Sequence, residues 1–326
     1  IYVFGNKTDL RGFGSSGLRD FGTLGRITAM QACVPISLQL DGAMSREQFD
    51  SQFATEEACA DYLIKLRWPE GYCCLRCGSR DIGCLRSRRL PLFVCRNCHY
   101  QASPPVGTVM ERSSTPLRVW FLICFLSAQS AHRMNAAAIS RAVSVTYKTA
   151  WLILMKLRQA IATSDARRPL AGAVTVNSGF ASERDCYSNQ RNRRDAPVLI
   201  GATFHESGSL RRLKIKLVSL RHMEEKQVQP EGTAAFAERH VTAGSFVRSV
   251  TARFTARRNK RLLPHFEHAL QWMHVTYGGI GKKHLQVYLD EICFRLCAVH
   301  RGKSCFSPFV RLCATTTPFP YASIVA

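Results

Sequence analysis

Two pairs of cysteines are the residues of this chain whose spacing most clearly indicates chemistry. Cys74 and Cys77 form one Cys-x2-Cys pair, Cys95 and Cys98 form the other, and 17 residues separate the two pairs. Two such pairs can surround one Zn²⁺ with four thiolates in tetrahedral geometry. We therefore predict a zinc ribbon in which these four cysteines bind a structural Zn²⁺.

Disulfide bonding is the competing use of cysteine in a chain that has 14 of them. The cysteines outside the ribbon show no paired framework, and no signal peptide opens the sequence. We therefore expect reduced thiols and residence in a bacterial cytoplasm, in association with the nucleoid.

The ribbon segment is strongly cationic. One acid, Asp81, lies among its six arginines, which are Arg76, Arg80, Arg86, Arg88, Arg89 and Arg96. The whole chain has 45 Lys and Arg against 23 Asp and Glu, a net charge of +22 and a pI near 9.9. This charge predicts double-stranded DNA as the partner, with Arg86, Arg88 and Arg89 as candidate contacts. The alternatives are a zinc site that is only a structural staple and arginines that form only a solvated face.

Length and hydropathy bound the architecture. The longest apolar run, residues 119–128, is about half of what a bilayer span needs, so it predicts a buried helix and no membrane segment. A chain of 326 residues favours two or three domains. The boundaries that we expect are a weakly ordered extension (1–43), a helix plus zinc ribbon (44–110), a helix-turn-helix region (111–168), a catalytic-type core (169–300) and a C-terminal tail (301–326).

Helix signals surround the ribbon. Thr55 can cap a helix that leads into the ribbon, with Glu56 and Glu57 in its first turn, and Thr115 followed by Pro116 can start a buried helix that contains Trp120. A helix from Asn135 to Ala142, a break at 143–145 and a second helix at 146–161 have helix-turn-helix spacing.

In a helix-turn-helix motif the first residues of the second helix face base edges. The candidates are Ser144, Thr146, Tyr147 and Lys148, with Lys156 and Arg158 reaching phosphates. Two helices joined by a tight turn are also common in helical bundles, which is the alternative interpretation.

The period changes from helical to strand-like after residue 170. We predict strands at 174–176, 197–204, 213–217 and 245–250, a hairpin turn at 206–209, and helices at 233–239 and 283–296. Three antiparallel strands followed by helix and strand suggest a ribonuclease-H-like core with a mixed sheet. The expected fold class is therefore multidomain α+β, with an N-terminal zinc ribbon, a helix-turn-helix and this core.

Motifs on both sides of residues 178–275 share one resemblance. They include residues 53–59 (Phe-Ala-Thr-Glu-Glu-Ala-Cys), Arg67-Trp68-Pro69, the cysteine quartet, Lys148-Thr149-Ala150-Trp151 and residues 282–295, from Lys282-Lys283-His284 to Cys293-Phe294-Arg295. Together they resemble the zinc-ribbon transposases of insertion sequences. That family implies a DDE-type recombinase, in which two aspartates and a third acidic or amide ligand hold Mg²⁺ for in-line phosphodiester chemistry.

The three ligand positions that the resemblance implies have lost their acids. They fall on Asn177, Val250 and His268. An amide brings no charge, valine has no ligand atom and imidazole suits zinc better than magnesium, so we expect that Mg²⁺ is not bound. Asp185, Asp195 and Glu267 could substitute only in a different fold geometry. Asp290 and Glu291 point about 100° apart on a helix, so they are expected to face solvent and a partner and not one ion.

The resulting hypothesis is a DNA-binding insertion-sequence transposase that is catalytically impaired. The alternatives are a non-catalytic regulator that binds related element ends, and the translation of a decayed transposase gene. The first residue, which is not Met, and the degraded stretch at 178–275 favour the last alternative. Family members act as assemblies on paired terminal repeats, so the resemblance also implies a homo-oligomer.

Overall fold

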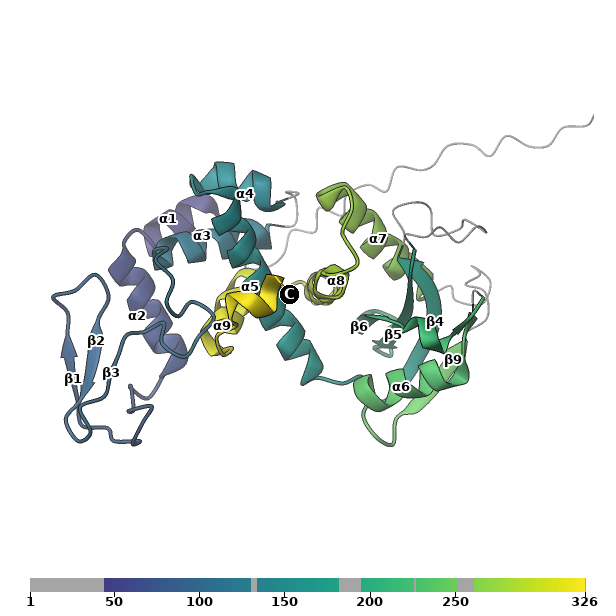
Figure 1. The fold of residues 1–326 in the computed structure, drawn as a ribbon, viewed down its shortest axis with the longest axis horizontal. Helices are drawn as coiled ribbons and strands as arrows, with labels where there is room; N and C mark the ends of the chain where they lie inside the picture. Colours follow the sequence, from purple (N-terminus) through teal and green to yellow (C-terminus); the bar gives the residue numbers. More distant parts are fainter. Residues whose placement is uncertain (1–43, 130–133, 182–194, 226, 251–260, 326) are drawn as a thin grey trace, which may run out of the picture. The chain divides into compact units, whose positions relative to one another are not determined.

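The computed structural model describes residues 44–129, 134–181, 195–225, 227–250 and 261–325. Within these ranges the chain is a mixed α+β protein (Figure 1). The expected extension at 1–43 lies outside the described residues. No helix in the described ranges is both long enough and apolar enough to cross a bilayer.

Helices from both ends of the chain share one apolar core. They are α1 (Arg46–Gln52), α2 (Glu56–Arg67), α3 (Leu117–Ala128), α4 (Ala136–Val143), α5 (Tyr147–Ala166) and α9 (Phe306–Thr315). Phe49, Phe53, Trp120 and Phe121 are almost fully buried in this core. The Phe53 ring packs edge to face on Phe121 and at a tilt on Phe49. The prediction that Trp120 is a core residue is confirmed.

A side chain at the N-cap position caps these helices, except α3 and α9. Thr55 accepts a hydrogen bond from the backbone of Ala58 and caps α2, as predicted. The side chain of Thr115 does not cap α3. Instead, the Glu56 carboxylate accepts the backbone N–H groups of Leu117 and Arg118, at 2.8 and 3.0 Å. This carboxylate therefore satisfies two open donors of another helix and stabilises its positive end.

The segment 301–326 is not a tail. It forms α9 and α10 (Tyr321–Val325), and α9 inserts Phe306, Phe309 and Cys313 into the helical core. The prediction of a tail was wrong because most partners of this 10-residue apolar stripe are distant in sequence. These partners, α2, α3 and α5, lie more than 130 residues earlier, and α8 adds the Phe294 ring, which stacks on Phe309.

A small antiparallel sheet forms the ribbon. Its strands are β1 (Ile82–Leu85), β2 (Leu92–Cys95) and β3 (Gln101–Ala102), in the order β1-β2-β3. The β1–β2 hairpin presents residues 86–91 at its turn.

The second sheet has the order β6-β5-β4-β9. Its strands are β4 (Ala173–Ala181), β5 (Ala196–Phe204), β6 (Leu210–Leu217) and β9 (Phe246–Val250). The first three pair antiparallel and β9 pairs parallel to β4. Between β6 and β9 the chain forms a short 3-10 helix (Leu220–His222), strands β7 (Met223–Glu224) and β8 (Gln227–Val228), and helix α6 (Pro230–His240). The predicted strands and hairpin turn are confirmed.

Helices cover both faces of this sheet (Figure 1). On one face α7 (Leu263–Tyr277) and α8 (Leu285–Val299) pack on alternate residues such as Val198 and Ile200. On the other face α6 packs through Phe236. Glycine permits the close approach on each face: a Cβ at Gly179 would lie 2.8 Å from the Phe266 ring, and one at Gly201 would lie 2.7 Å from Phe236.

Candidate zinc centre and nucleic-acid interface

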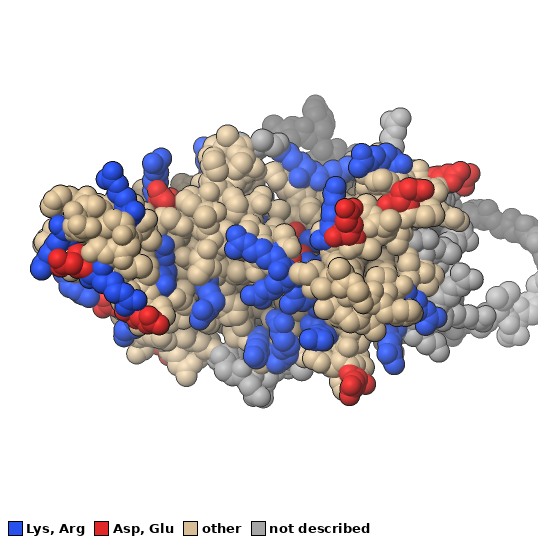
Figure 2. Space-filling view, turned by 90° about the horizontal axis from the view of Figure 1, so that it is seen from below, with Lys and Arg blue, Asp and Glu red and all other residues tan. Residues whose placement is uncertain are grey.

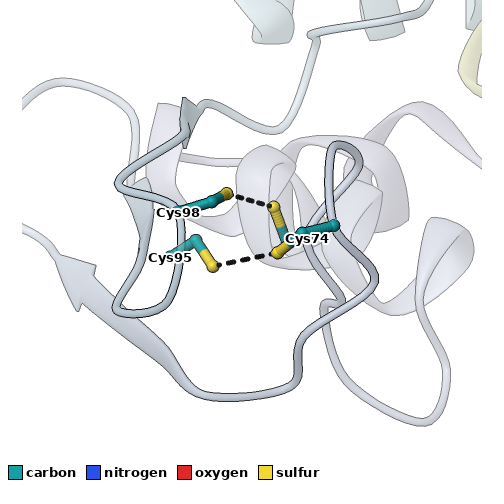
Figure 3. A group of neighbouring side chains, drawn as sticks. Cys74, Cys95 and Cys98 are labelled. Carbon is teal, nitrogen blue, oxygen red and sulfur yellow. Dashed lines mark hydrogen bonds between the residues drawn. The ribbon is translucent and has the colours of Figure 1, made fainter.

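The four predicted zinc ligands converge. Their sulfur atoms all lie within 4.8 Å of one another, with Sγ–Sγ distances of 3.5 Å for Cys74–Cys98 and 3.6 Å for Cys77–Cys95 (Figure 3). Four sulfurs at about 2.3 Å from a tetrahedral Zn²⁺ would be separated by about 3.8 Å. The arrangement therefore fits a structural Zn²⁺ that would join the turn before β1 to the turn after β2.

The backbone around the sulfurs favours thiolates. Burial by itself raises the pKa of Cys74, but hydrogen bonds from the backbone of Cys77 and Arg76 outweigh it and hold this pKa at about 6. At Cys95 a hydrogen bond from the backbone of Cys98 is the largest cause of a lowered pKa. At Cys98 a hydrogen bond from the backbone of Tyr100 lowers the pKa, but burial and the neighbouring thiols of the quartet raise it to about 12. Because the thiolate is the form that binds metal, the backbone favours metal binding most clearly at Cys74 and Cys95.

An aromatic stack fastens the ribbon to α2. Tyr72 and Phe93 stack with ring centroids 4.4 Å apart, Trp68 contacts both rings edge-on, and the Arg67 guanidinium lies 4.2 Å from the Trp68 ring. Arg67 also donates to the carbonyl oxygens of Pro104 and Val106, which follow β3. The ribbon is thus held to the C-terminal end of α2 by aromatic packing and by the hydrogen bonds of Arg67.

The three arginines proposed as DNA contacts of the ribbon differ in their surroundings. Arg86 pairs with Glu57 and Asp61 on α2, at 3.3 and 3.2 Å, and Arg89 approaches Glu56 at 3.9 Å. Arg88 is exposed and forms no ion pair within the described part of the chain. Arg86 and Arg89 therefore orient the hairpin on α2, and Arg88 is the one that projects without an acidic neighbour.

The predicted pair of helices is present as α4 and α5. Ser144 ends α4 in a left-handed conformation (φ 57°), the Ser140 hydroxyl donates to the carbonyl of Val145, and Thr146 caps α5. The two helices therefore meet at a rigid three-residue turn.

The four proposed base contacts, Ser144, Thr146, Tyr147 and Lys148, are all exposed around the start of α5. Tyr147 is 58% exposed. The Lys148 ammonium lies 5.6 Å from the Tyr321 ring of α10. These side chains are accessible to a partner.

The two residues proposed to contact phosphates, Lys156 and Arg158, are turned toward the protein. The Lys156 ammonium is half-buried and donates to the carbonyl of Val109 at 2.9 Å, above the Trp120 ring. Arg158 is only 2% exposed. Helix α5 is packed along this part of its length, so its cations face protein and not solvent.

Arg158 belongs to a buried ionic network that joins α5 to α8. Its Nε lies 2.6 Å from a Glu291 carboxylate oxygen, Arg295 Nη2 lies 2.6 Å from the other, and the Tyr288 ring lies under the guanidinium at 4.0 Å. Burial by itself raises the pKa of Glu291, but Arg158 and Arg295 lower it to about 2. The expectation that Glu291 faces solvent or a partner is therefore wrong.

A second network lies beside the first. The Asp165 carboxylate of α5 is 2.7 Å from Lys214 Nζ and 2.8 Å from Lys216 Nζ, and Lys216 is also 2.6 Å from Asp290. Asp290, which was expected to be exposed, is 4% exposed. Neither network was found from the sequence, because the paired charges come from segments up to 133 residues apart.

Comparison with known proteins identifies the ribbon. Residues 54–101 match a family described as a transposase zinc-ribbon domain of the IS1595 type, a range that holds all four cysteines. An uncharacterized protein in the transposable element ISH50 of Halobacterium salinarum is 28% identical over 149 residues. The chain is thus similar to a transposase zinc-ribbon domain over residues 54–101 and to a transposable-element protein over 149 residues. The match covers 43% of this chain and 48% of the ISH50 protein, so it spans about half the length of this relative. No solved structure matches.

The transposase resemblance places its first two acidic ligands at Asn177 and Val250, and these residues are neighbours in the sheet. Asn177 of β4 pairs with Val250 of β9 in the parallel ladder. Asn177 is fully buried. It lies on the α7 side of β4, because Val174 and Val176 contact the α6 cluster and Gly179 faces Phe266. His268, at the third position, is exposed on α7.

The side chains at these three positions do not fit Mg²⁺. An amide, an isopropyl group and an imidazole supply no carboxylate, whereas a magnesium site for phosphoryl transfer uses anionic oxygen. Among the acids considered as substitutes, Asp195 precedes β5, Glu267 lies on α7, and Asp185 lies outside the described residues. The cysteine quartet is the one group of three or more metal-ligating side chains found in the described ranges.

Proposed function

We propose that this chain is a DNA-binding relative of insertion-sequence transposases that has lost the metal-dependent cleavage and joining of DNA strands. The observation that carries the proposal is the pairing of Asn177 with Val250 at the junction of β4 and β9. The two positions where the family would place its first two metal-binding aspartates are side by side, and neither has a carboxylate.

The sheet supports a ribonuclease-H-like core. Three antiparallel strands, then a helix, then a strand parallel to the first give the order β6-β5-β4-β9 with helices on both faces. Such a core would bring acids from β4, β9 and α7 together on one face. Chemistry at that point needs carboxylates to hold metal ions that stabilise the developing charge by several kcal/mol, so their replacement would remove the activity.

The DNA-binding half of the proposal depends on the ribbon and the start of α5. The ribbon would be a rigid cationic element in which zinc fixes the backbone and Arg88 reaches a phosphate. The exposed side chains at the start of α5, Tyr147 and Lys148 among them, would enter the major groove if α4 and α5 act as a helix-turn-helix. Terminal repeats of the encoding element are the expected duplex.

A mobility-shift titration tests this proposal. The zinc-loaded chain is titrated with a duplex taken from the ends of its element and with a shuffled duplex of the same length, at 50 and 200 mM salt. We expect tighter binding to the element ends and a steep loss of affinity at the higher salt. Equal affinity for both duplexes would reduce the interaction to general electrostatics and would refute recognition of the ends.

A second candidate function is repression of, or competition with, an active transposase at related ends. It is favoured by the preservation of the zinc cluster and the exposed start of α5 in a chain that lacks all three acids. A strand-transfer assay with an active relative tests it. Addition of this chain should lower product yield in proportion to occupancy of the ends, and an unchanged yield would contradict it.

Decay of the gene remains an alternative. Translation of the other two frames across residues 178–275 would recover the missing aspartates if frameshifts had removed them. Association with the nucleoid and self-assembly on paired ends would both follow from binding to terminal repeats, and they are part of the same proposal.

A further inference from the structure

Three distant segments of the chain meet at Arg212, whose guanidinium is acted on by the charges of Arg168 and Arg301, and two more cations lie within two residues of these in sequence. The group, called here the α5–β6–α8 patch, consists of two residues after α5, one near the start of β6 and two after α8: Arg167, Arg168, Arg212, Arg301 and Lys303. The Arg212 guanidinium donates to the backbone carbonyl of Arg168 at 2.8 Å. All but Arg212 are exposed. Figure 2 shows one face of the molecule, on which Lys and Arg are more prominent than Asp and Glu.

The patch has no acid of its own. None of the five cations forms an ion pair within the described ranges. The acid that acts on Arg212 is Asp165, and its carboxylate is already held by Lys214 and Lys216. Burial is the largest cause of a lowered pKa at Arg212, and the charges of Arg168 and Arg301 lower it further. The positive charges of the patch therefore repel one another.

Helix dipoles explain only part of this arrangement. Helices α5 and α8 both end at the patch, and cations are favoured at the C-terminal end of a helix. Each helix end is equivalent to about half a negative charge. Two ends offset about one of the five positive charges, so roughly four remain uncompensated.

We propose that the α5–β6–α8 patch binds the phosphate backbone of duplex DNA, as a contact separate from the ribbon and from the start of α5. This proposal rests on the proposed function, because it takes DNA as the partner. Four of the five residues are arginines, whose planar guanidinium matches phosphate oxygens in two hydrogen bonds. The cations come together from three segments, whereas a solvated run of charge would come from one. Contacts of this kind position a duplex without reading its sequence.

A double variant, Arg168→Ala with Arg301→Ala, tests the patch. Both side chains are exposed, and Arg212 keeps its bond to the backbone carbonyl of residue 168. Each lost phosphate contact should reduce the salt dependence of log K by about 0.9 and weaken binding at 0.1 M salt by about 8-fold. We expect the double variant to bind a 40-base-pair duplex between about 8-fold and 60-fold more weakly by fluorescence anisotropy.

A matched control has the same change of net charge. Arg112→Ala with Arg311→Ala removes two exposed arginines elsewhere and should change affinity less than 3-fold. Lys303→Ala, on the turn after α8, gives a second test with a loss of about 8-fold. Circular dichroism melting should be the same for all variants, which separates lost binding from lost fold.

The outcomes distinguish this proposal from the function on which it rests. If the patch variants bind DNA as the control does, the patch proposal is overturned while DNA binding by the ribbon stands. If the patch variants lose affinity for RNA of equal length and keep affinity for DNA, the choice of partner is also overturned. If the unaltered chain binds no duplex at all, the proposed function itself fails.

Discussion

The buried carboxylate of Glu291 should be one of the largest single contributors to the stability of this chain. It is 2% exposed and lies 2.6 Å from both Arg158 Nε and Arg295 Nη2. Glu291→Gln keeps the shape of the side chain but leaves two buried guanidinium groups without a negative charge. Removal of one partner from a buried ion pair typically costs about 3 to 5 kcal/mol.

The pKa of Glu291 gives a second value for the contribution of this carboxylate to the free energy of unfolding. A carboxyl group whose pKa falls from its ordinary 4.5 to about 2 on folding contributes roughly 3 kcal/mol to the free energy of unfolding at neutral pH. Because the folded pKa is the lower one, this contribution is complete above pH 4.5 and is lost as the pH falls toward 2. The unaltered chain should therefore lose its advantage over Glu291→Gln progressively within that window.

Urea unfolding measures this loss through tryptophan fluorescence, since the Trp272 ring lies 5.4 Å from the Arg295 guanidinium. A loss of about 3 kcal/mol with a slope of up to about 3 kcal/mol/M lowers the midpoint by about 1 M or more. Glu70→Gln is the control, because its pair with Arg80 is exposed and should contribute less than about 1 kcal/mol. A shift for Glu291→Gln no larger than that of the control would refute the reasoning.

Three further predictions concern the zinc ribbon, the start of α3 and the DNA contacts. Cys95→Ser, or chelation, should lower the zinc content measured by native mass spectrometry and weaken duplex binding; full affinity without metal would contradict the role of zinc. Glu56→Gln should destabilise the chain by about 1 kcal/mol in urea titrations, because it removes the charge that caps α3, and an unchanged midpoint would refute this. Lys148→Ala should weaken DNA binding in the mobility-shift assay while Lys156→Ala should not, since only Lys148 is exposed; the reverse order would contradict the proposed interface.

Local signals in the sequence were sufficient for the ribbon and for most of the secondary structure. The cysteine spacing alone predicts the convergence of four sulfurs, because two short turns and a hairpin leave them little freedom. The cap at Thr55, the break at 143–145 and the alternation in β6 likewise depend on neighbours within a few residues. Each of these predictions depends on interactions between residues that are close in sequence.

Predictions about charged residues failed where the partner is distant. Arg158 and Glu291 each looked like surface residues, and only the packing of α5 against α8 shows that they neutralise each other. The capping of α3 by Glu56 and the burial of α9 have the same origin. In a chain with a net charge of +22, the buried acids Asp165, Asp290 and Glu291 each hold particular cations, and the sequence does not state which ones.

A cleavage assay tests the central claim most directly. The zinc-loaded chain is incubated with a labelled duplex that carries the terminal repeats of its element, in the presence of Mg²⁺ or Mn²⁺, and both bound complex and strand products are measured. We predict that the duplex is bound and that no nicked or joined strand forms. A metal-dependent product with a free 3′-hydroxyl at the repeat boundary would contradict the loss of catalysis inferred from Asn177, Val250 and His268.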